Sequence, residues 1–315
     1  MGDGTFDNRI TRLLGVDIPI ANAPMGGVAS APLVAAVANC GGIGFIPGSM
    51  GPVGARARIR ETRELTARPF GVNIPTRFAD PAILDVMLEE QVSCVTTSTG
   101  PVGPYIPQLK AAGITVLHVV TSLEEAKRAA DAGVDGLIVE GSEAGALRGP
   151  NEVAAMVLLP LVTERVDLPV IAAGGIVDGR SMAAAFALGA EGVLMGTRFI
   201  ASVEASVHAN YKNALVAAAE TDTVVINRHN RAPLRVLRTE TTERYERSGE
   251  GDPFAELIPS MMKLYVDGDM NAAFASAGVG TGRIEDVQPV AEIIDRTVAE
   301  FRAVIERLAR DHATA

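Results

Sequence analysis

The sequence has few cysteines, no basic cluster and no apolar run long enough to cross a membrane. Its two cysteines, Cys40 and Cys94, lie in apolar stretches, which favours buried, reduced thiols. With 28 Lys and Arg against 38 Asp and Glu, the net charge is −10, so nucleic acid and anionic membranes are poor partners. The N-terminus lacks an apolar signal core. We therefore expect a soluble, cytoplasmic protein with no nucleic-acid or membrane partner.

Two ligand-binding signatures are also missing. The four histidines and two cysteines are scattered without metal-ligand spacing, so no metal site is predicted. No Walker-type loop is present, which argues against a nucleoside triphosphate as ligand.

Short apolar runs that alternate with Ala-rich helical stretches dominate the chain. This alternation is typical of a parallel sheet with helical crossovers. Eight such runs are found, at 18–24, 42–48, 69–75, 93–99, 115–120, 136–141, 169–176 and 192–200. Eight units favour a closed (β/α)8 TIM barrel over a doubly wound sheet, which commonly uses fewer strands. Ser122, with Glu125 three residues later, predicts the N-cap of the helix after the fifth strand.

The pattern breaks after the eighth strand. Residues 206–285 contain two helical stretches, a polar run and a Gly-rich segment. An amphipathic stretch, 290–311, follows and would serve as the eighth barrel helix. We therefore predict a barrel formed by 1–205 and 286–315, with 206–285 as a smaller, mostly helical cap over the C-terminal face, where barrel enzymes place their sites.

Glycines follow the seventh and eighth strands, in AAGGI (172–176) and MGTRF (195–199). The loops after these two strands frequently form a phosphate site in TIM barrels. Gly174 and Gly175 would let the backbone approach an anion from one side. Gly196 and Thr197 would supply N–H groups and a hydroxyl from the other. Tight turns alone would also explain either motif, but the pair on these two strands favours phosphate binding.

Several segments in order along the chain resemble one family. They are PIANAPMGGVA (19–29), VANCGGIGFI (37–46), RPFGVNIP (68–75), VEGSEAGALRG (139–149), PVIAAGGIVDGR (169–180) and GVLMGTRFIAS (192–202). Together they resemble the nitronate monooxygenases, formerly called 2-nitropropane dioxygenases. That family includes flavin-dependent enoyl-acyl-carrier-protein reductases and an NADH:quinone reductase branch. The stretch HANYKNALVAAAETDT (208–223) is more similar to the enoyl reductase branch.

The resemblance implies FMN at the C-terminal mouth of the barrel. FMN could be reduced by NADH or NADPH even without a Rossmann fingerprint, since the family uses none. The implied cofactor-binding residues are Pro24, Met25 and Gly26 by the isoalloxazine ring, Asn73 at its polar edge, Glu140 and Gly141 after the sixth strand, and Ala173, Gly174, Gly175, Gly196 and Thr197 at the phosphate. The resemblance is compatible with a homodimer but does not fix the oligomeric state.

The sequence departs from the family at two polar positions. The family's active-site loop reads E-A-G-G-H-x-G, and its catalytic histidine falls on Leu147, which can neither take nor give a proton. The family's A-G-Q-x-x-G segment has Val279 in place of its amide. If both positions face the flavin, a changed substrate pocket is expected.

Four residues are weak candidates to replace the missing histidine. His118 on the fifth strand could point to the barrel mouth, and His208 resembles a cap position of the enoyl reductase branch. Glu143 and Arg148 lie in the active-site loop, where Arg148 could hold an anionic substrate and a surface ion pair is equally expected. His229 and His312 are expected on the surface.

Three functions compete, each with a small-molecule substrate. The first is oxidation of an alkyl nitronate by FMN and dioxygen, which needs no base because the nitronate is already deprotonated. The second is an NAD(P)H-dependent reduction, through FMN, of an enoyl thioester, a quinone or another conjugated carbonyl. The third is a flavin-binding protein without turnover.

Overall fold

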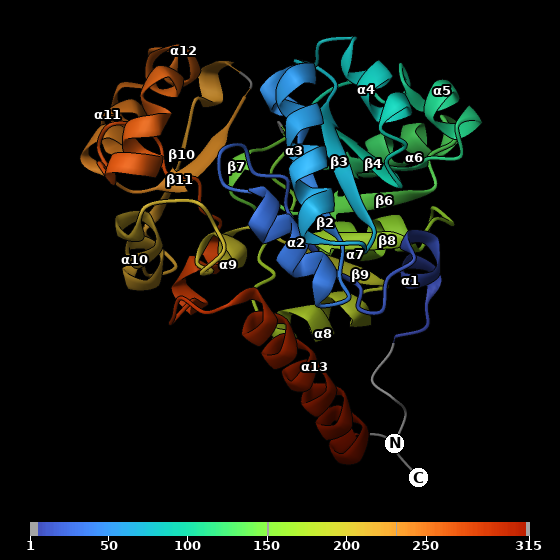
Figure 1. Ribbon diagram of the computed structural model, residues 1–315. Coiled ribbons are helices and arrows are strands. Elements are labelled where there is room, and N and C mark those ends of the chain that lie inside the picture. The colour runs from blue at the N-terminus through green and yellow to red at the C-terminus, as the bar shows by residue number, and fades with distance from the viewer. Residues whose placement is uncertain (1–5, 150, 231, 313–315) are drawn as a thin grey trace.

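Eight parallel strands form the centre of the computed structural model, which describes residues 6–149, 151–230 and 232–312 (Figure 1). They are β1 (Ile20–Asn22), β2 (Gly44–Pro47), β3 (Phe70–Pro75), β4 (Cys94–Ser98), β5 (Thr115–Val120), β6 (Gly136–Glu140), β8 (Val170–Ala173) and β9 (Gly192–Met195). Their order is β1-β9-β8-β6-β5-β4-β3-β2, and a parallel bridge between Ala21 and Ile43 brings the two end strands together. The predicted TIM barrel is confirmed.

The strand predicted over 192–200 is wrong beyond Met195. Thr197–Ile200 forms a short helix, α9, because the N–H groups of Phe199 and Ile200 both donate to the Gly196 carbonyl. The strand predicted over 169–176 likewise ends at Ala173. Gly174 and Gly175 follow with φ of +91° and +74°, which an extended strand cannot contain.

A helix follows each strand on the outside of the barrel. These are α2 (Ala31–Asn39), α3 (Gly51–Leu65, after the turn η1, Gly48–Met50), α4 (Ile83–Glu89), α5 (Ile106–Ala111), α6 (Leu123–Asp131), α7 (Ala155–Thr163), α8 (Gly179–Ala187) and α13 (Val290–His312). As predicted, α13 takes the eighth place and packs against α8 and α2. Within the described ranges, no helix combines the length and apolarity that crossing a bilayer requires.

The N-cap predicted for α6 is confirmed, with one change in the predicted pairing. The Ser122 hydroxyl accepts a hydrogen bond from the Glu125 N–H (3.2 Å). The Glu125 carboxylate accepts from the N–H (2.7 Å) and hydroxyl (2.9 Å) of Thr121, one residue before the N-cap. This arrangement fixes the β5–α6 loop at the barrel mouth.

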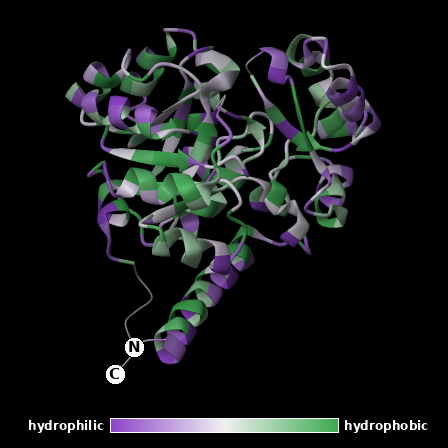
Figure 2. Ribbon diagram, turned by 180° about the vertical axis from the view of Figure 1, so that it is seen from behind, coloured by the Kyte–Doolittle hydropathy of each residue, from purple (hydrophilic) through white to green (hydrophobic). Residues whose placement is uncertain are grey.

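Side chains inside the barrel alternate along each strand with those that face the helices. The inner cluster contains Leu117, Ile138 and Ile171, and α1 (Arg9–Leu14) closes its lower end with Ile10 and Leu14. Figure 2 shows these strands as a largely hydrophobic centre. Of the two cysteines, Cys94 is buried in this cluster, but Cys40, predicted to be buried, is only half-buried because it lies at the C-cap of α2.

The segment after α9 packs beside the barrel mouth (Figure 1). It contains α10 (Ala209–Ala217), β10 (Thr223–Ile226), η2 (Arg228–Asn230), β11 (Leu234–Leu237), α11 (Glu240–Ser248), α12 (Pro253–Leu257), η3 (Ile258–Ser260), the π-helix η4 (Lys263–Asp267) and η5 (Val279–Arg283). The expectation of a mostly helical cap missed a small antiparallel sheet, β10-β11-β7. Its third strand, β7 (Ala146–Leu147), comes from the loop after β6, so this sheet joins cap and barrel.

The buried carboxylate of Glu90 ties α3 to α4. Its oxygens lie 3.0, 2.9 and 2.7 Å from guanidinium nitrogens of Arg56, Arg60 and Arg63. Burial alone would raise the pKa of Glu90, but hydrogen bonds from Arg60 and Arg56 and the Arg60 and Arg63 charges lower it. Helix α3 also packs against β2, which lies beside β3 in the barrel.

Glu90→Ala should lower the free energy of unfolding by about 2 kcal/mol, because three guanidinium groups lose their common partner and repel one another. The measurement is the urea unfolding midpoint. Glu89→Ala is the control, because Glu89 is exposed and pairs only with Arg56. Equal losses in the two variants would contradict a special role for Glu90.

Candidate active site

A cavity of about 730 Å³ opens at the C-terminal ends of the strands. Its walls come from the loops after β1, β4, β6, β8 and β9 and from two cap segments, around Tyr265 and 276–280. A cavity of this size suits a cofactor or a drug-sized ligand. It lies at the face where TIM-barrel enzymes hold their catalytic groups.

One end of the cavity is built from backbone groups after β8 and β9. Gly174 and Gly175 both have positive φ, and a Cβ at Gly174 would lie 2.9 Å from the Gly141 carbonyl oxygen. Among the described residues, the N–H groups of Gly175 and Thr197 find no acceptor. The Thr197 hydroxyl accepts from the Gly278 N–H (2.9 Å), which leaves its proton free to donate. These donors line the cavity and could hold an anion.

The loop after β1 forms another wall and is held by the cap. Pro24, Met25 and Gly26 line the cavity, and the Tyr265 hydroxyl donates to the Gly26 carbonyl (3.2 Å). A Cβ on Gly27 would lie 2.3 Å from the Tyr265 ring, so the two segments meet closely. Tyr265 was not predicted as a site residue. Its signal was weak, because it lies in a helical-looking stretch that forms a π-helix in the structure.

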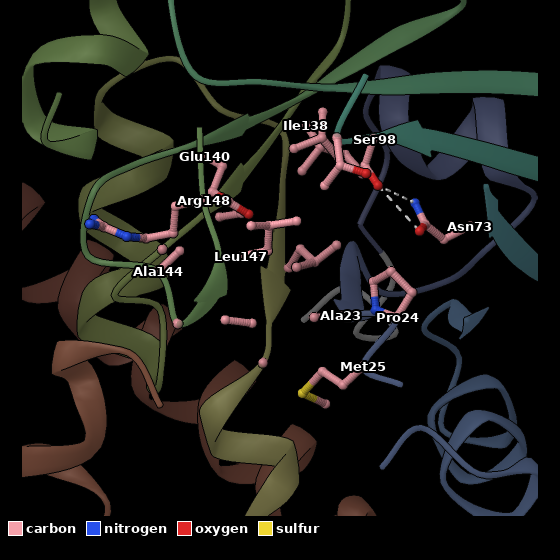
Figure 3. A pocket seen from close by; sticks show the side chains of 18 of the residues that line it. Ala23, Pro24, Met25, Asn73, Ser98, Ile138, Glu140, Ala144, Leu147 and Arg148 are labelled. Atoms are coloured by element: carbon pink, nitrogen blue, oxygen red, sulfur yellow. Dashed lines mark hydrogen bonds between the residues drawn. The ribbon is translucent and has the colours of Figure 1, made fainter. Parts of the chain in front are cut away.

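A polar floor comes from β3 and β4 (Figure 3). The Asn73 amide nitrogen donates to the hydroxyls of Thr96 (3.0 Å) and Ser98 (3.2 Å), and the Ser98 hydroxyl donates to the Asn73 amide oxygen (3.3 Å). These three side chains hold one another at the bottom of the cavity. Thr96 and Ser98 were not predicted as site residues, and the run of hydroxyl side chains in SCVTTST is the signal that could have indicated them.

Glu140 is the only Asp or Glu in the eight barrel strands, and it lines the cavity. It stands two residues after Ile138 on β6, so strand alternation directs it to the inner face. Its side chain makes no hydrogen bond or ion pair within the described ranges. Burial raises the pKa of Glu140 to about 7, while the Arg148 charge lowers it and the Glu125 charge raises it. Its neighbour Gly141 does not line the cavity but packs behind Gly174.

The loop after β6 contains Leu147 and two predicted candidates, Glu143 and Arg148. Leu147 and Arg148 both line the cavity, but the Arg148 side chain extends outward from it in Figure 3. The Arg148 guanidinium donates to the Ser142 carbonyl (2.5 Å) and to the Glu152 carboxylate (2.7 Å). The Glu143 carboxylate accepts from the Ala155 N–H, the first residue of α7. Arg148 and Glu143 are therefore engaged in holding the loop and the helix.

The histidines lie apart from the inner face. His118 lines the cavity, but its neighbours Leu117 and Val119 belong to the inner cluster, so its ring is on the helix-facing side. There its Nδ1 lies 2.7 Å from the Thr97 hydroxyl, and burial lowers the pKa of His118 to about 4. His208 caps α10 and does not line the cavity. His229 and His312 are exposed.

Val279 also lies outside the cavity lining, although its neighbours Gly278 and Gly280 contribute to it. Of the two positions at which the resemblance implied an apolar replacement, only Leu147 lines the cavity. The backbone N–H of Val279 donates to the Glu143 carbonyl (3.1 Å), and the pocket change expected at Val279 is not found.

Comparison with known proteins places this chain in a family. The family model described as nitronate monooxygenase matches residues 7–84 and 76–300. A curated relative from Rhodococcus jostii is 40% identical over 247 residues, which cover 78% of this chain and 69% of the relative. It is named (3aS,4S,5R,7aS)-5-hydroxy-7a-methyl-1-oxo-octahydro-1H-indene-4-carboxyl-CoA dehydrogenase. A nitronate monooxygenase from Paraburkholderia phytofirmans is 38% identical, covering 70% of this chain and 73% of the relative.

Solved structures share the whole architecture. FabK from Thermotoga maritima superimposes with a TM-score of 0.92 at 41% identity, covering 97% of this chain and 99% of that chain. A nitroalkane oxidase from Streptomyces ansochromogenes gives a TM-score of 0.86 at 28% identity, covering 96% of this chain and 100% of that chain.

Proposed function

Because this chain belongs to the nitronate monooxygenase family and is a flavin-dependent oxidoreductase, we propose that its cavity binds FMN and oxidises an alkyl nitronate with dioxygen. The residues present fit the cofactor. Gly174, Gly175, Gly196 and Thr197 would take the phosphate through free N–H and hydroxyl donors, and Pro24, Met25 and Gly26 would flank the ring. Bound FMN would supply two-electron redox chemistry.

Leu147 is the observation that carries the nitronate proposal. It lines the cavity at the position that the resemblance assigns to the family's catalytic histidine, and a leucine there offers an apolar surface and no proton acceptor. A nitronate anion arrives already deprotonated and needs no base from this loop. The apolar side chains of Met25, Leu147 and Val177 would contact its alkyl chain.

A second candidate is an NAD(P)H-linked reaction of an acyl thioester. The relative named as a carboxyl-CoA dehydrogenase supports it. Arg77 and Arg128 also line the cavity with exposed side chains, and their guanidinium groups would meet the phosphates of a CoA carrier at the entrance. In this reaction the thioester, rather than a nitronate, would occupy the apolar part of the cavity.

One anaerobic experiment separates the two candidates. The purified protein is loaded with FMN, and flavin absorbance is followed while an alkyl nitronate, NADH or NADPH is added in separate cells. Bleaching by the nitronate, followed by recovery on admitting dioxygen, is the expected result. Bleaching by NADH or NADPH alone would instead favour the thioester reaction, and no bleaching by any of the three would contradict both.

A further inference from the structure

We propose that Glu140 is a catalytic base that converts neutral nitroalkanes into nitronates inside this cavity, so that the site prepares its own substrate. The inference rests on the proposed function, because the nitronate formed is the substrate proposed above. It assigns to a strand residue the proton transfer that Leu147 cannot perform.

Placement is the first support for this role. Glu140 is the last residue of β6, and it pairs in register with Ala173 directly before the Gly174–Gly175 turn. Its side chain lines the same cavity as Leu147, which comes from β7 in the loop after β6 (Figure 3). A carboxylate on a barrel strand is held more rigidly than one on a loop, which favours proton transfer at a fixed point.

The lack of a partner is the second support. The other carboxylates near the cavity are occupied: Glu125 accepts from Thr121, and Glu143 accepts from the first N–H of α7. Glu140 has no such partner within the described residues. Glu140 is half-buried, and a carboxyl without a hydrogen-bond partner at a cavity wall is free to bind a ligand or a proton.

The surrounding charges suit a base near neutral pH. Arg148, from the loop after β6, and Glu125, from α6, act on Glu140 with opposite sign. The neighbouring strands contribute the uncharged Val119 and Ala173 to the inner face, and His118 on β5 faces the helices. Burial therefore dominates and raises the pKa of Glu140 to about 7. A base whose pKa lies near the working pH is the most effective one.

The proposed step transfers one proton and no external electrons. The carbon–hydrogen bond next to the nitro group breaks, its proton forms an O–H bond with the Glu140 carboxylate, and the electron pair stays on the nitroalkane as nitronate. No oxidant is needed. The proton then leaves Glu140 to water through the open mouth of the cavity.

The test follows this step while oxidation is limited to one turnover of the bound flavin. FMN-loaded protein and nitroethane are mixed anaerobically in D2O, and loss of the methylene proton signal is followed by proton NMR. Wild-type protein should accelerate exchange above the buffer rate, and the rate should rise with pH through about 7 as Glu140 loses its proton. Glu140→Gln should lower the enzymatic rate by roughly 10²- to 10⁴-fold, the usual contribution of a positioned base.

Two further variants sharpen the result. Glu64→Gln changes an exposed carboxylate on α3 that does not line the cavity, and it should exchange like wild type. Glu140→Gln combined with Leu147→His should recover part of the exchange, because it returns a base to the cavity wall. If Glu140→Gln does not fold, Glu140→Asp serves instead and should keep the rise of exchange with pH at a changed rate.

The outcomes separate this inference from the proposed function. Nitronate oxidation without any enzymatic exchange of nitroethane would overturn the inference and leave the proposed function standing. Exchange that persists in Glu140→Gln would also overturn it. Exchange that depends on Glu140 in a protein that fails to oxidise nitronates would support the base and sink the proposed function.

Discussion

Gly174→Ala should weaken FMN binding by roughly 10- to 100-fold. Gly174 has a φ of +91°, which an alanine adopts only with strain, and the added Cβ would lie 2.9 Å from the Gly141 carbonyl oxygen. Strain of this kind costs about 1–3 kcal/mol, and each 1.4 kcal/mol is about tenfold in affinity. The turn would move to relieve it and carry the Gly175 N–H away from the phosphate. Fluorescence titration of flavin-free protein with FMN measures the effect.

Gly113→Ala is the matched control for this prediction. Gly113 ends α5 with a φ of +73°, and no atom lies within 4 Å of a Cβ built there. It therefore carries a similar backbone strain but lies outside the cavity lining. Both variants should lose thermal stability, and only Gly174→Ala should lose FMN affinity. Equal FMN affinity in both variants would remove the turn after β8 from the phosphate site.

Much of the barrel could be predicted because its strands are buried on both faces. Such strands read as short apolar runs separated by Gly, Pro and polar helix starts, and eight of them were found in order. Strand ends were harder. The sequence GTRFI is as apolar and β-branched as a strand, and only the hydrogen bonds to the Gly196 carbonyl turn it into α9.

The cap sheet could not be predicted from local pattern. Strands β10 and β11 have four residues each, and β7 has two that come from a loop some 75 residues earlier in the chain. Their pairing depends on the β6 loop reaching over the barrel mouth. The polar run over Glu240–Ser248 proved to be α11. The Thr239 hydroxyl caps this helix by accepting a hydrogen bond from the Thr242 N–H.

The backbone part of the site was easier to predict than the acid–base part. Glycines at the ends of two strands indicate that the backbone can approach a ligand closely there, and in the structure these glycines line one end of the cavity. Side-chain direction depends on strand phase, which the sequence does not give for a strand buried on both faces. His118 and Glu140 both line the cavity but differ by this phase, because His118 lies on the helix-facing side of β5 and Glu140 on the inner face of β6.

Glu140→Gln should make the folded protein more stable at pH 8 than wild type, with a smaller or no gain at pH 4.5. Burial raises the pKa of Glu140 to about 7 from its ordinary value of 4.5. Below pH 4.5 the carboxyl is protonated in both the folded and the unfolded chain, and burying it carries no charge penalty. As the pH rises from 4.5 to 7, the unfolded chain loses this proton while the folded protein keeps it, so stability falls.

Above pH 7 the difference should level off at roughly 3 kcal/mol, because one pKa unit corresponds to about 1.36 kcal/mol. Glutamine has nearly the same shape and does not ionise, so the variant avoids this loss. Urea unfolding of FMN-loaded wild type and Glu140→Gln at pH 4.5, 6 and 8 measures the difference, and Glu64→Gln, which changes an exposed carboxylate, should differ from wild type by the same amount at each pH. A gain in the free energy of unfolding for Glu140→Gln that does not grow with pH would show that the carboxyl ionises in the cavity without destabilising the folded protein. A pKa near neutrality would then require a bound ligand.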